Sequence, residues 1–255
     1  MGKRIRVQRR GRGNSVFRAS THKRVAPSRY PSLTISAKEH YEAATNGIIE
    51  RLIHDPGRGS PLALVRFENG EKCYTIVPEG IHTGQQIQIG GKAIVEVGNI
   101  LPLGKIPEGT MICNIELRPG DGGKITKSSG TYATVVTHTP QGTIIKLPSG
   151  KSKYIDNYCR ATVGVVSGAG KLEKPFLKAG AKFHMMKAKG HKYPRTRGRA
   201  MVPAVHPFGS SKRSARVGTT TSHGAPPGQK VGLIAARGTG RKKKSARAAA
   251  IAEGL

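Results

Sequence analysis

The clearest signal of the fold is the succession Leu62-Ala63-Leu64-Val65-Arg66-Phe67, Asn69-Gly70 and Cys73-Tyr74-Thr75-Ile76-Val77. Two short runs rich in β-branched and aromatic residues flank a pair of turn residues, which is the pattern of a β-hairpin. We expect Asn69-Gly70 to form a type I′ turn, because both central positions of that turn need positive φ. The pattern predicts a β fold with antiparallel strands.

Short strands are also expected on either side of this hairpin. Residues 47–53 precede it, and residues 86–89 and 93–97 follow it, each run bounded by turn residues. About five strands in roughly fifty residues is typical of a small closed barrel of the oligonucleotide-binding kind.

A second group of strands follows a Pro/Gly-rich bend at residues 99–109, where we expect a domain boundary. The candidate strands are residues 111–117, 132–138, 143–147 and 161–166. Pro140-Gln141-Gly142 and Pro148-Ser149-Gly150 supply tight turns between them. Short strands at this spacing favour an SH3-like barrel.

The charge of the chain is concentrated at its two ends. The formal net charge is +30. Residues 1–35 contain ten Lys or Arg and no acid, residues 36–173 contain fifteen against thirteen acids, and residues 174–255 contain nineteen against one. A nearly neutral body with two basic extensions fits this distribution, and a nucleic acid is the expected partner because a polyanion relieves the repulsion.

Both ends lack the apolar residues that a core of their own would need. We therefore expect the free chain to fold only between about Tyr41 and Ser167. Beyond Lys174 the sequence predicts an extended tail, apart from a short helix at residues 245–253. Glycines alternate with the cations of both tails, which lets the backbone approach phosphates closely.

The spacing of reactive residues argues against several chemistries. Cys73, Cys113 and Cys159 lie far apart with no Cys-x-x-Cys pair, so we expect reduced core thiols and no structural zinc. No Gly-Lys pair has the spacing of a phosphate-binding loop, and no Gly-x-Ser-x-Gly motif offers a nucleophile. No signal peptide and no membrane-spanning run is recognisable, so a soluble intracellular protein is expected.

Aromatic residues are sparse, with no Trp, seven Tyr and five Phe. Proteins that bind single strands use aromatic stacking platforms, so phosphate contact and shape should dominate here. The sequence therefore favours folded RNA as the partner.

Several stretches match family motifs in the same order along the chain. They are Lys3-Arg4-Ile5-Arg6, Gln8-Arg9-Arg10-Gly11-Arg12-Gly13, His54-Asp55-Pro56-Gly57-Arg58-Gly59, Asn99-Ile100-Leu101-Pro102-Leu103, Ile106-Pro107-Glu108-Gly109-Thr110, Lys146-Leu147-Pro148-Ser149-Gly150, Glu173-Lys174-Pro175-Phe176-Leu177-Lys178-Ala179-Gly180 and Ala225-Pro226-Pro227-Gly228-Gln229-Lys230-Val231-Gly232-Leu233-Ile234-Ala235-Ala236-Arg237. Along nearly all of its length the chain closely resembles the L2 family of large-subunit ribosomal proteins, in its archaeal and eukaryotic cytosolic form.

The resemblance implies an all-β fold, with an oligonucleotide-binding barrel followed by an SH3-like barrel and with long irregular basic extensions embedded in large-subunit ribosomal RNA. It implies a structural component near the peptidyl-transferase region that supports subunit association, while the RNA performs the chemistry. Neighbouring ribosomal proteins are expected partners, and neither a homo-oligomer nor a membrane partner is expected. No cofactor is expected beyond Mg²⁺ ions bound to the RNA. The expected location is the cytoplasmic large subunit, with nuclear and nucleolar passage in a eukaryote.

Within this framework we expect a basic extension at residues 1–40, the first barrel at 41–98, the second at 99–190 and a basic extension at 191–255. The residues expected to bind ribosomal RNA are Lys3, Arg4, Arg6, Arg9, Arg10, Arg12, Arg18, His22, Lys23, Arg24, Arg58, Lys174, Lys178, Lys182, Lys187, Lys189, Arg195, Arg197, Arg199, His206, Lys230, Arg237 and Arg241. The run Arg241-Lys242-Lys243-Lys244 fits either a nuclear import signal or a further phosphate contact.

The chain departs from the family pattern around His206. Family members usually carry Asn and an acid where this chain has Val202 and Ala204, and glycines where it has Ser210-Ser211-Lys212. A general base needs an orienting partner, and this chain lacks the usual acid. We therefore expect His206 to position RNA and not to catalyse.

Two other functions remain open on sequence alone. A free-standing RNA chaperone or assembly factor would share the basic ends. An enzyme acting on RNA should show clustered carboxylates for metal ions, whereas Asp55, Asp121 and Asp156 are scattered.

Overall fold

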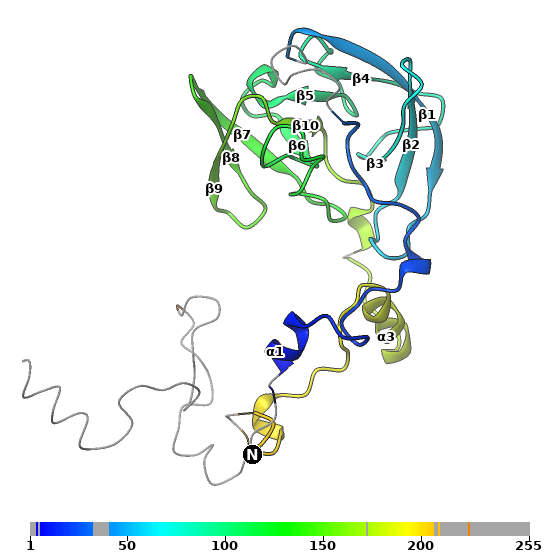
Figure 1. The fold of residues 1–255 in the computed structure, drawn as a ribbon, viewed down its shortest axis with the longest axis vertical. Coiled ribbons are helices and arrows are strands. Elements are labelled where there is room, and N and C mark those ends of the chain that lie inside the picture. Colours follow the sequence, from blue (N-terminus) through cyan, green and yellow to red (C-terminus); the bar gives the residue numbers. More distant parts are fainter. Residues whose placement is uncertain are drawn as a thin grey trace, which may run out of the picture. The chain divides into compact units, whose positions relative to one another are not determined.

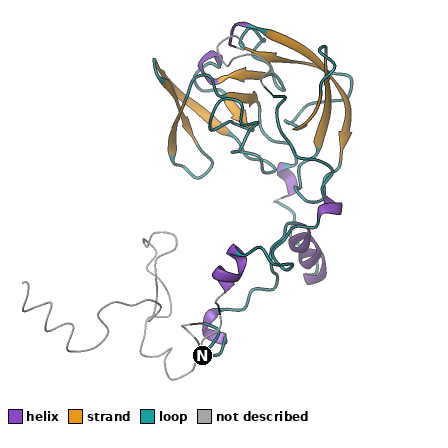
Figure 2. Cartoon of the chain, in the orientation of Figure 1, coloured by secondary structure: helices purple, strands orange, loops and turns teal. Residues whose placement is uncertain are grey.

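The computed structural model describes residue 4, residues 6–32, 41–171 and 173–206, and residues 209 and 224. The chain divides into two compact units. The body is Ala19–Gly190, and the terminal unit combines Met1–Arg18 with His191–Leu255. The strands lie in the body (Figures 1 and 2).

The described strands of the body form one sheet in the order β3-β2-β1-β4-β5-β10-β6-β7-β8-β9. The strands are β1 (Ala44–Ile53), β2 (Leu62–Phe67), β3 (Lys72–Ile76), β4 (Gln86–Gly90), β5 (Ile100–Pro102), β6 (Met111–Cys113), β7 (Ala133–Thr139), β8 (Gly142–Lys146), β9 (Ser152–Ile155) and β10 (Arg160–Val163). Figure 2 shows the strands gathered into two curved groups, which are the oligonucleotide-binding and SH3-like barrels.

The first barrel is built on the long strand β1, which pairs antiparallel with both β2 and β4. Its inward side chains include Ile49, Val65, Phe67 and Ile87, all at most 3% exposed. Gly47 lies against the Phe67 ring, at a point where a Cβ would be 2.8 Å from a ring carbon. The predicted strands at 47–53, 62–67, 73–77 and 86–89 are confirmed within a few residues.

The second barrel contains β6 to β9, and β10 joins it to the first. β10 pairs antiparallel with both β5 and β6, and β5 meets β4 in a parallel bridge between Ile100 and Ile89. Its core includes Leu101, Ile112, Ile145 and Ala161. The strands predicted at 132–138, 143–147 and 161–166 are confirmed, whereas the one predicted at 111–117 shortens to Met111–Cys113.

The strand predicted at residues 93–97 is wrong. The Gln88 side chain accepts the Ile94 N–H at 3.0 Å, and the Asn99 amide donates to the Ile94 carbonyl at 2.9 Å. These side chains replace the backbone pairing of a strand, and Ile94 is 60% exposed. The bend is expected at residues 99–109. This segment begins with the buried strand β5, which pairs with β4 on one side and β10 on the other.

The type I′ turn predicted at Asn69-Gly70 is also wrong, although the hairpin itself is confirmed. Gly70 has φ 81°, but Asn69 is not among the described non-glycine residues with positive φ. The Gly70 N–H donates to the Phe67 carbonyl at 3.0 Å, and Asn69 Oδ1 accepts the Glu71 N–H at 3.1 Å. This is a longer hairpin loop with one left-handed glycine, which leaves Asn69 free to bond through its side chain.

Residues 23–32, here called the strap, belong to the body. Tyr30 is only 4% exposed, and its hydroxyl donates to the Asn114 carbonyl at 2.7 Å and lies 2.6 Å from the Thr162 hydroxyl. The Arg29 and Tyr30 N–H groups donate to the carbonyls of Tyr74 and Gly122. The expectation that the folded part begins near Tyr41 is therefore wrong, because the strap supplies part of the core.

A buried ion pair joins the strap to both barrels. Arg160 and Glu116 are at most 1% exposed, with Nη2 2.7 Å from Oε1 and Nε 3.2 Å from Oε2. Glu116 also accepts the N–H groups of Arg160 and Gly122 at 2.9 Å. Arg160 donates its remaining Nη1 to the Pro31 carbonyl at 3.0 Å and lies over the Tyr30 ring. Every charged atom of the pair therefore has a partner.

The prediction of an extended tail after Lys174 is wrong for residues 179–188, which form the helix α3 (Ala179–Ala188). Ala188 is the buried residue of α3, so the helix shows no apolar face that a sequence pattern could reveal. The helix predicted at residues 245–253 lies outside the described residues. None of the described helices is long and apolar enough to cross a membrane.

The three cysteines are free thiols, as predicted. Cys113 and Cys159 are buried and Cys73 is half-buried. Burial raises the pKa of each thiol from 9.0 to about 12, so none is a thiolate at neutral pH.

Glu116→Gln should lower the free energy of unfolding of the isolated protein by about 3–5 kcal/mol, because it leaves the buried Arg160 without its counter-charge. Urea denaturation followed by circular dichroism measures this. Glu50→Gln is the matched control, because Glu50 pairs with the exposed Arg66 and Lys72 and should cost at most about 1 kcal/mol. Equal losses in the two variants would contradict the central role of the buried pair.

Candidate RNA interface

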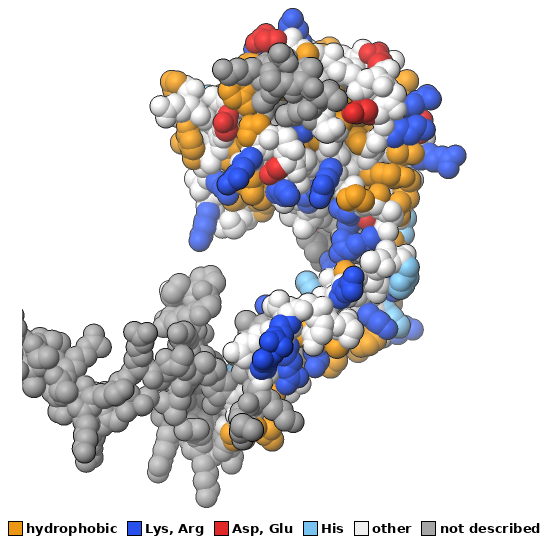
Figure 3. All heavy atoms as spheres, viewed as in Figure 1, with side chains coloured by type: hydrophobic (Ala, Val, Ile, Leu, Met, Phe, Trp, Pro, Cys, Tyr) orange, Lys and Arg blue, Asp and Glu red, His pale blue; other side chains and the backbone are white. Residues whose placement is uncertain are grey.

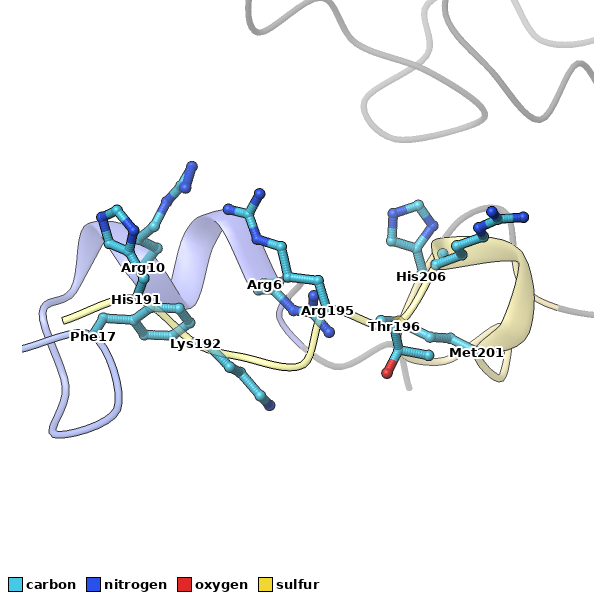
Figure 4. A pocket seen from close by; sticks show the side chains of 11 residues that line it. Arg6, Arg10, Phe17, His191, Lys192, Arg195, Thr196, Met201 and His206 are labelled. Carbon is cyan, nitrogen blue, oxygen red and sulfur yellow. The ribbon is translucent and has the colours of Figure 1, made fainter. Parts of the chain in front are cut away.

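The terminal unit brings the two ends of the chain together around one hollow. Helix α1 (Arg6–Gly11) lies along residues 191–197, and the 3-10 turn Gly198–Ala200 follows (Figure 4). The hollow has a volume of about 470 Å³. It is lined by Arg6, Arg10, Phe17, His191, Lys192, Arg195, Thr196, Arg197, Gly198, Met201 and His206.

The lining residues divide by exposure. Phe17, Met201 and His206 are half-buried and form the floor, together with Arg6 and Gly198. The exposed residues form the rim, and they are Arg10, His191, Lys192, Arg195, Thr196 and Arg197. A Cβ at Gly198 would overlap the His206 ring, so the ring lies directly on the glycine backbone. The absence of a side chain at Gly198 therefore fixes where this imidazole can lie.

The hollow is strongly cationic. Five of its lining residues are Lys or Arg, and none of the described lining residues is acidic. A concave surface lined by one sign of charge concentrates counter-ions within it. Figure 3 shows acidic side chains on the barrels, whereas Lys, Arg and His predominate on the described part of the terminal unit. This surface is built to receive an anion.

A second group of cations, the body cluster, lies where the strap meets two loops of the barrels. It consists of Arg29, Arg58, Lys124, Lys127 and Lys171. Lys127 donates to the carbonyls of Ser28 at 2.8 Å and Gly123 at 2.9 Å. Burial lowers the pKa of the Lys127 ammonium from 10.5 to about 8, and the charges of Arg58 and Lys124 act in the same direction. Gathering these cations is therefore unfavourable in the free protein.

Arg58 is held in place from two sides. Its Nε donates to Asp55 at 2.7 Å, and its Nη2 donates to the Ala26 carbonyl at 2.6 Å. Asp55 is fully buried and also accepts the Gly57 N–H. The neighbouring Gly59 has φ 91°, and the Lys171 ammonium lies 2.6 Å from the point that a Cβ would occupy. The sequence Asp55-Pro56-Gly57-Arg58-Gly59 is thus a loop that fixes Arg58 and leaves room beside Gly59 for the Lys171 ammonium.

The structure places nine of the predicted contact residues in these two regions or beside them. Arg6, Arg10, Arg195, Arg197 and His206 line the hollow, and Arg9 lines an adjoining hollow of about 260 Å³. In the body, Arg58 belongs to the body cluster, and Gly57 donates its N–H to the Lys23 carbonyl beside Arg24.

Other predicted residues are not gathered by the described structure. Lys182 and Lys187 are carried by α3, and Lys174 and Lys178 precede it on an exposed segment. Burial lowers the pKa of Lys171, and the nearby charge of Lys189 acts in the same direction. The remaining described predictions, Arg4, Arg12, Arg18, His22 and Arg199, are exposed, and Lys3, Lys230, Arg237 and Arg241 lie outside the described residues.

Sequence reasoning missed several residues of both regions. Lys127, Lys124 and Lys171 lie within the nearly neutral central block, where no charge run marks them. Phe17 carries a signal that could have been used, because it is a large apolar side chain within an otherwise polar, cationic tail. Lys192 and His191 belong to the same basic run as Arg195 and carry no separate signal.

Two β-barrels, a rigid cationic cluster and a cationic hollow built from both chain ends define a structural RNA-binding protein. The family model "Ribosomal Proteins L2, RNA binding N-terminal domain" matches residues 1–89, and "Ribosomal Proteins L2, C-terminal domain" matches residues 96–230. The chain belongs to the ribosomal protein L2 family.

Curated relatives agree over nearly the full length. The chain is 51% identical over 248 residues to "Large ribosomal subunit protein uL2" of Korarchaeum cryptofilum, covering 96% of this chain and 98% of that protein. It is 50% identical to the uL2 protein of Thermofilum pendens, covering 97% and 98%. It is 47% identical to that of Methanococcoides burtonii, covering 95% and 100%.

Without RNA, the stability of the protein should rise with pH between about 8 and 10.5 because of Lys127. Below pH 8 the ammonium is charged in both the folded and the unfolded state. Between the two pKa values the unfolded chain binds the extra proton, so the free energy of unfolding increases with pH. Relative to Lys127→Met, the parent should gain on the order of 1 kcal/mol, discounted because the group is partly exposed.

Urea melts at pH 7, 8.5 and 10 measure this difference. Lys124→Met is the matched control, because it removes one nearby cation from an exposed position. A difference between parent and Lys127→Met that stays constant over this range would contradict the assigned burial of Lys127.

Proposed function

We propose that this chain holds folded RNA of the large ribosomal subunit against two cationic surfaces, the hollow and the body cluster, and that it catalyses no reaction. The chain is a structural protein of the large subunit. In this role the extensions reach into the RNA near the peptidyl-transferase region and support subunit association, as the family resemblance implies.

One observation carries the proposal. Cations from both ends of the chain converge on a single hollow, where their mutual repulsion disfavours the free protein. Such an arrangement is favourable only when a polyanion neutralises it. A phosphodiester backbone supplies closely spaced charges that match this requirement.

The body cluster adds a second contact surface, whose cations are held in place by hydrogen bonds. Arg58 and Lys127 are tied to the strap carbonyls of Ala26 and Ser28, so little side-chain freedom is lost when a phosphate binds. A phosphate would also raise the pKa of Lys127 back toward its ordinary value, because an opposite charge favours the ammonium. The fixed cations define a position on the RNA, and phosphate contacts of this kind set orientation.

The acids of the body support a structural role over metal-dependent RNA chemistry. Asp55 accepts from Gly57 and Arg58, Asp121 accepts from the Leu117 and Gly123 N–H groups, and Asp156 accepts from the Tyr158 N–H. Each carboxylate thus stabilises a turn of its own. Clustered carboxylates would be needed to hold catalytic ions.

We retain the division into extensions at 1–40 and 191–255 and barrels at 41–98 and 99–190, with the strap as the part of the N-terminal extension that packs into the body. Neighbouring ribosomal proteins would surround a single copy of the chain in cytoplasmic large subunits, with no membrane partner, and Mg²⁺ would belong to the RNA.

The alternative is a free-standing RNA chaperone or assembly factor, which the basic ends alone would also suit. Sedimentation of large subunits through high salt separates the two roles. A structural component remains with the subunit after the wash, whereas a factor that cycles on and off appears in the supernatant.

Binding of the full chain to a large-subunit RNA fragment should depend steeply on salt. If about eight to ten phosphates are neutralised, the slope of log affinity against log salt is roughly −7 to −9. Replacing Arg6, Arg10, Arg195 and Arg197 by Gln should make the slope shallower by about 3–4. Filter binding at four salt concentrations measures it.

The matched control replaces Lys72, Lys92, Lys146 and Lys153 by Gln, which are exposed cations outside both surfaces. This variant should change the slope by less than about 1. A parent slope near −2 would mean that the extensions remain solvated and that the barrels carry the binding.

His206→Gln should leave the chemical step of translation nearly intact. The His206 ring is half-buried on Gly198 in the floor of an RNA-binding hollow, and Ala204 stands where the family has an acid. Peptide-bond formation in fully assembled particles should stay within about tenfold of the parent, or roughly 1.4 kcal/mol in barrier. Assembly yield should fall more. A thousandfold loss in RNA-intact particles would establish a catalytic role.

A further inference from the structure

The hollow of the terminal unit has features that phosphate binding alone does not require. A phosphate needs cations and N–H donors, and Arg10, Arg195 and Lys192 on the rim supply the cations. The half-buried floor instead offers the Phe17 ring, the Met201 thioether and the His206 imidazole. Aromatic faces below a cationic rim are what nucleic-acid bases use for stacking.

The Phe17 and His206 rings lie at opposite ends of the hollow. In Figure 4, Phe17 and His191 lie at one end, Met201 and His206 lie at the other, and Arg6 and Arg195 lie between them. Two bases linked by one phosphate have the same order of groups. The cations in the middle would face the phosphate, and each end would offer a face to a base.

The dimensions favour unpaired RNA over a helix. A volume of about 470 Å³ lies within the range of pockets that enclose small molecules. A paired helix keeps its bases stacked inside and presents only its backbone and groove edges to such a hollow. Bases turned out of a bulge or loop can enter it.

The end of the hollow that carries His206 has a fixed shape. The His206 ring lies on the Gly198 backbone, because a Cβ there would overlap ring atoms. Gly209 similarly packs against the backbone of Met201 and Val202. A ring held in this way loses little freedom when a base stacks on it.

We propose that the hollow binds an unpaired segment of about two nucleotides, with one base on Phe17, the next on His206 and the linking phosphate between Arg6 and Arg195. The inference rests on the proposed RNA-binding function and narrows it to a local RNA structure, a bulge or loop. The remainder of the RNA contact stays a matter of phosphates and shape.

The test uses the full chain and two RNA hairpins of equal stem length, one with a two-adenosine bulge and one fully paired. One bulged adenosine is replaced by 2-aminopurine, whose fluorescence reports stacking. At equal salt the parent should bind the bulged hairpin at least tenfold more tightly than the paired one, and the fluorescence should change on binding.

Phe17→Leu should reduce this preference to less than threefold, because the side chain stays apolar and loses its stacking face. Gly198→Ala should reduce it as well, because the added methyl displaces the His206 ring without removing a charge. Phe176→Leu is the control, since Phe176 is 48% exposed and does not line the hollow, and it should retain the preference.

The possible results distinguish failure of the two-nucleotide site from failure of RNA binding as such. If the parent binds both hairpins equally, with steep salt dependence, the nucleotide site is refuted and RNA binding stands. If Phe17→Leu and Gly198→Ala both keep the tenfold preference, the site is likewise refuted. If neither hairpin is bound at low salt, the proposed function fails together with it.

Discussion

The buried pair between Glu116 and Arg160 is the interaction on which the body depends. Its charges are costly to bury, and they are tolerated because backbone N–H groups, the Pro31 carbonyl and the Tyr30 ring occupy the remaining positions around them. Glu116 belongs to the second barrel, Arg160 begins the strand that joins the barrels, and Pro31 belongs to the strap. Three parts of the chain are thereby fixed around a single guanidinium group.

This arrangement explains how an RNA-binding surface is kept rigid on a body of modest size. The strap crosses the body between the ion pair and the loop at residues 55–59, and its carbonyls hold Arg58 and Lys127. The strap therefore does two things: its carbonyls hold the mutually repelling cations Arg58 and Lys127 in place, and its Tyr30 ring completes the core. In the described part of the terminal unit, Arg9 Nε likewise donates to the Arg4 carbonyl at 3.0 Å, whereas Arg10, Lys192, Arg195 and Arg197 on the rim of the hollow are exposed.

Local patterns predicted the barrels because alternating residues such as Val65 and Phe67 report the buried face of a strand directly. They failed where a side chain replaced the backbone as hydrogen-bond partner, as Gln88 and Asn99 do at Ile94. They also missed β9, whose Ser152, Lys153 and Tyr154 are exposed. Clustered charge along the sequence revealed Arg6 and Arg195, but neither the hollow nor Lys127 could be inferred, because both arise from contacts between distant parts of the chain.

The strap also constrains the order in which the body can be completed during synthesis. Pro31 leaves the ribosome 129 residues before Arg160, which is the residue that binds its carbonyl. At about 5–20 residues per second, the strap waits on the order of ten seconds for its site to exist. Throughout that interval the Tyr30 ring and several cations are exposed in the nascent chain. The N-terminal end is thus made first and fixed last, a period in which a basic segment is open to capture by any nearby polyanion.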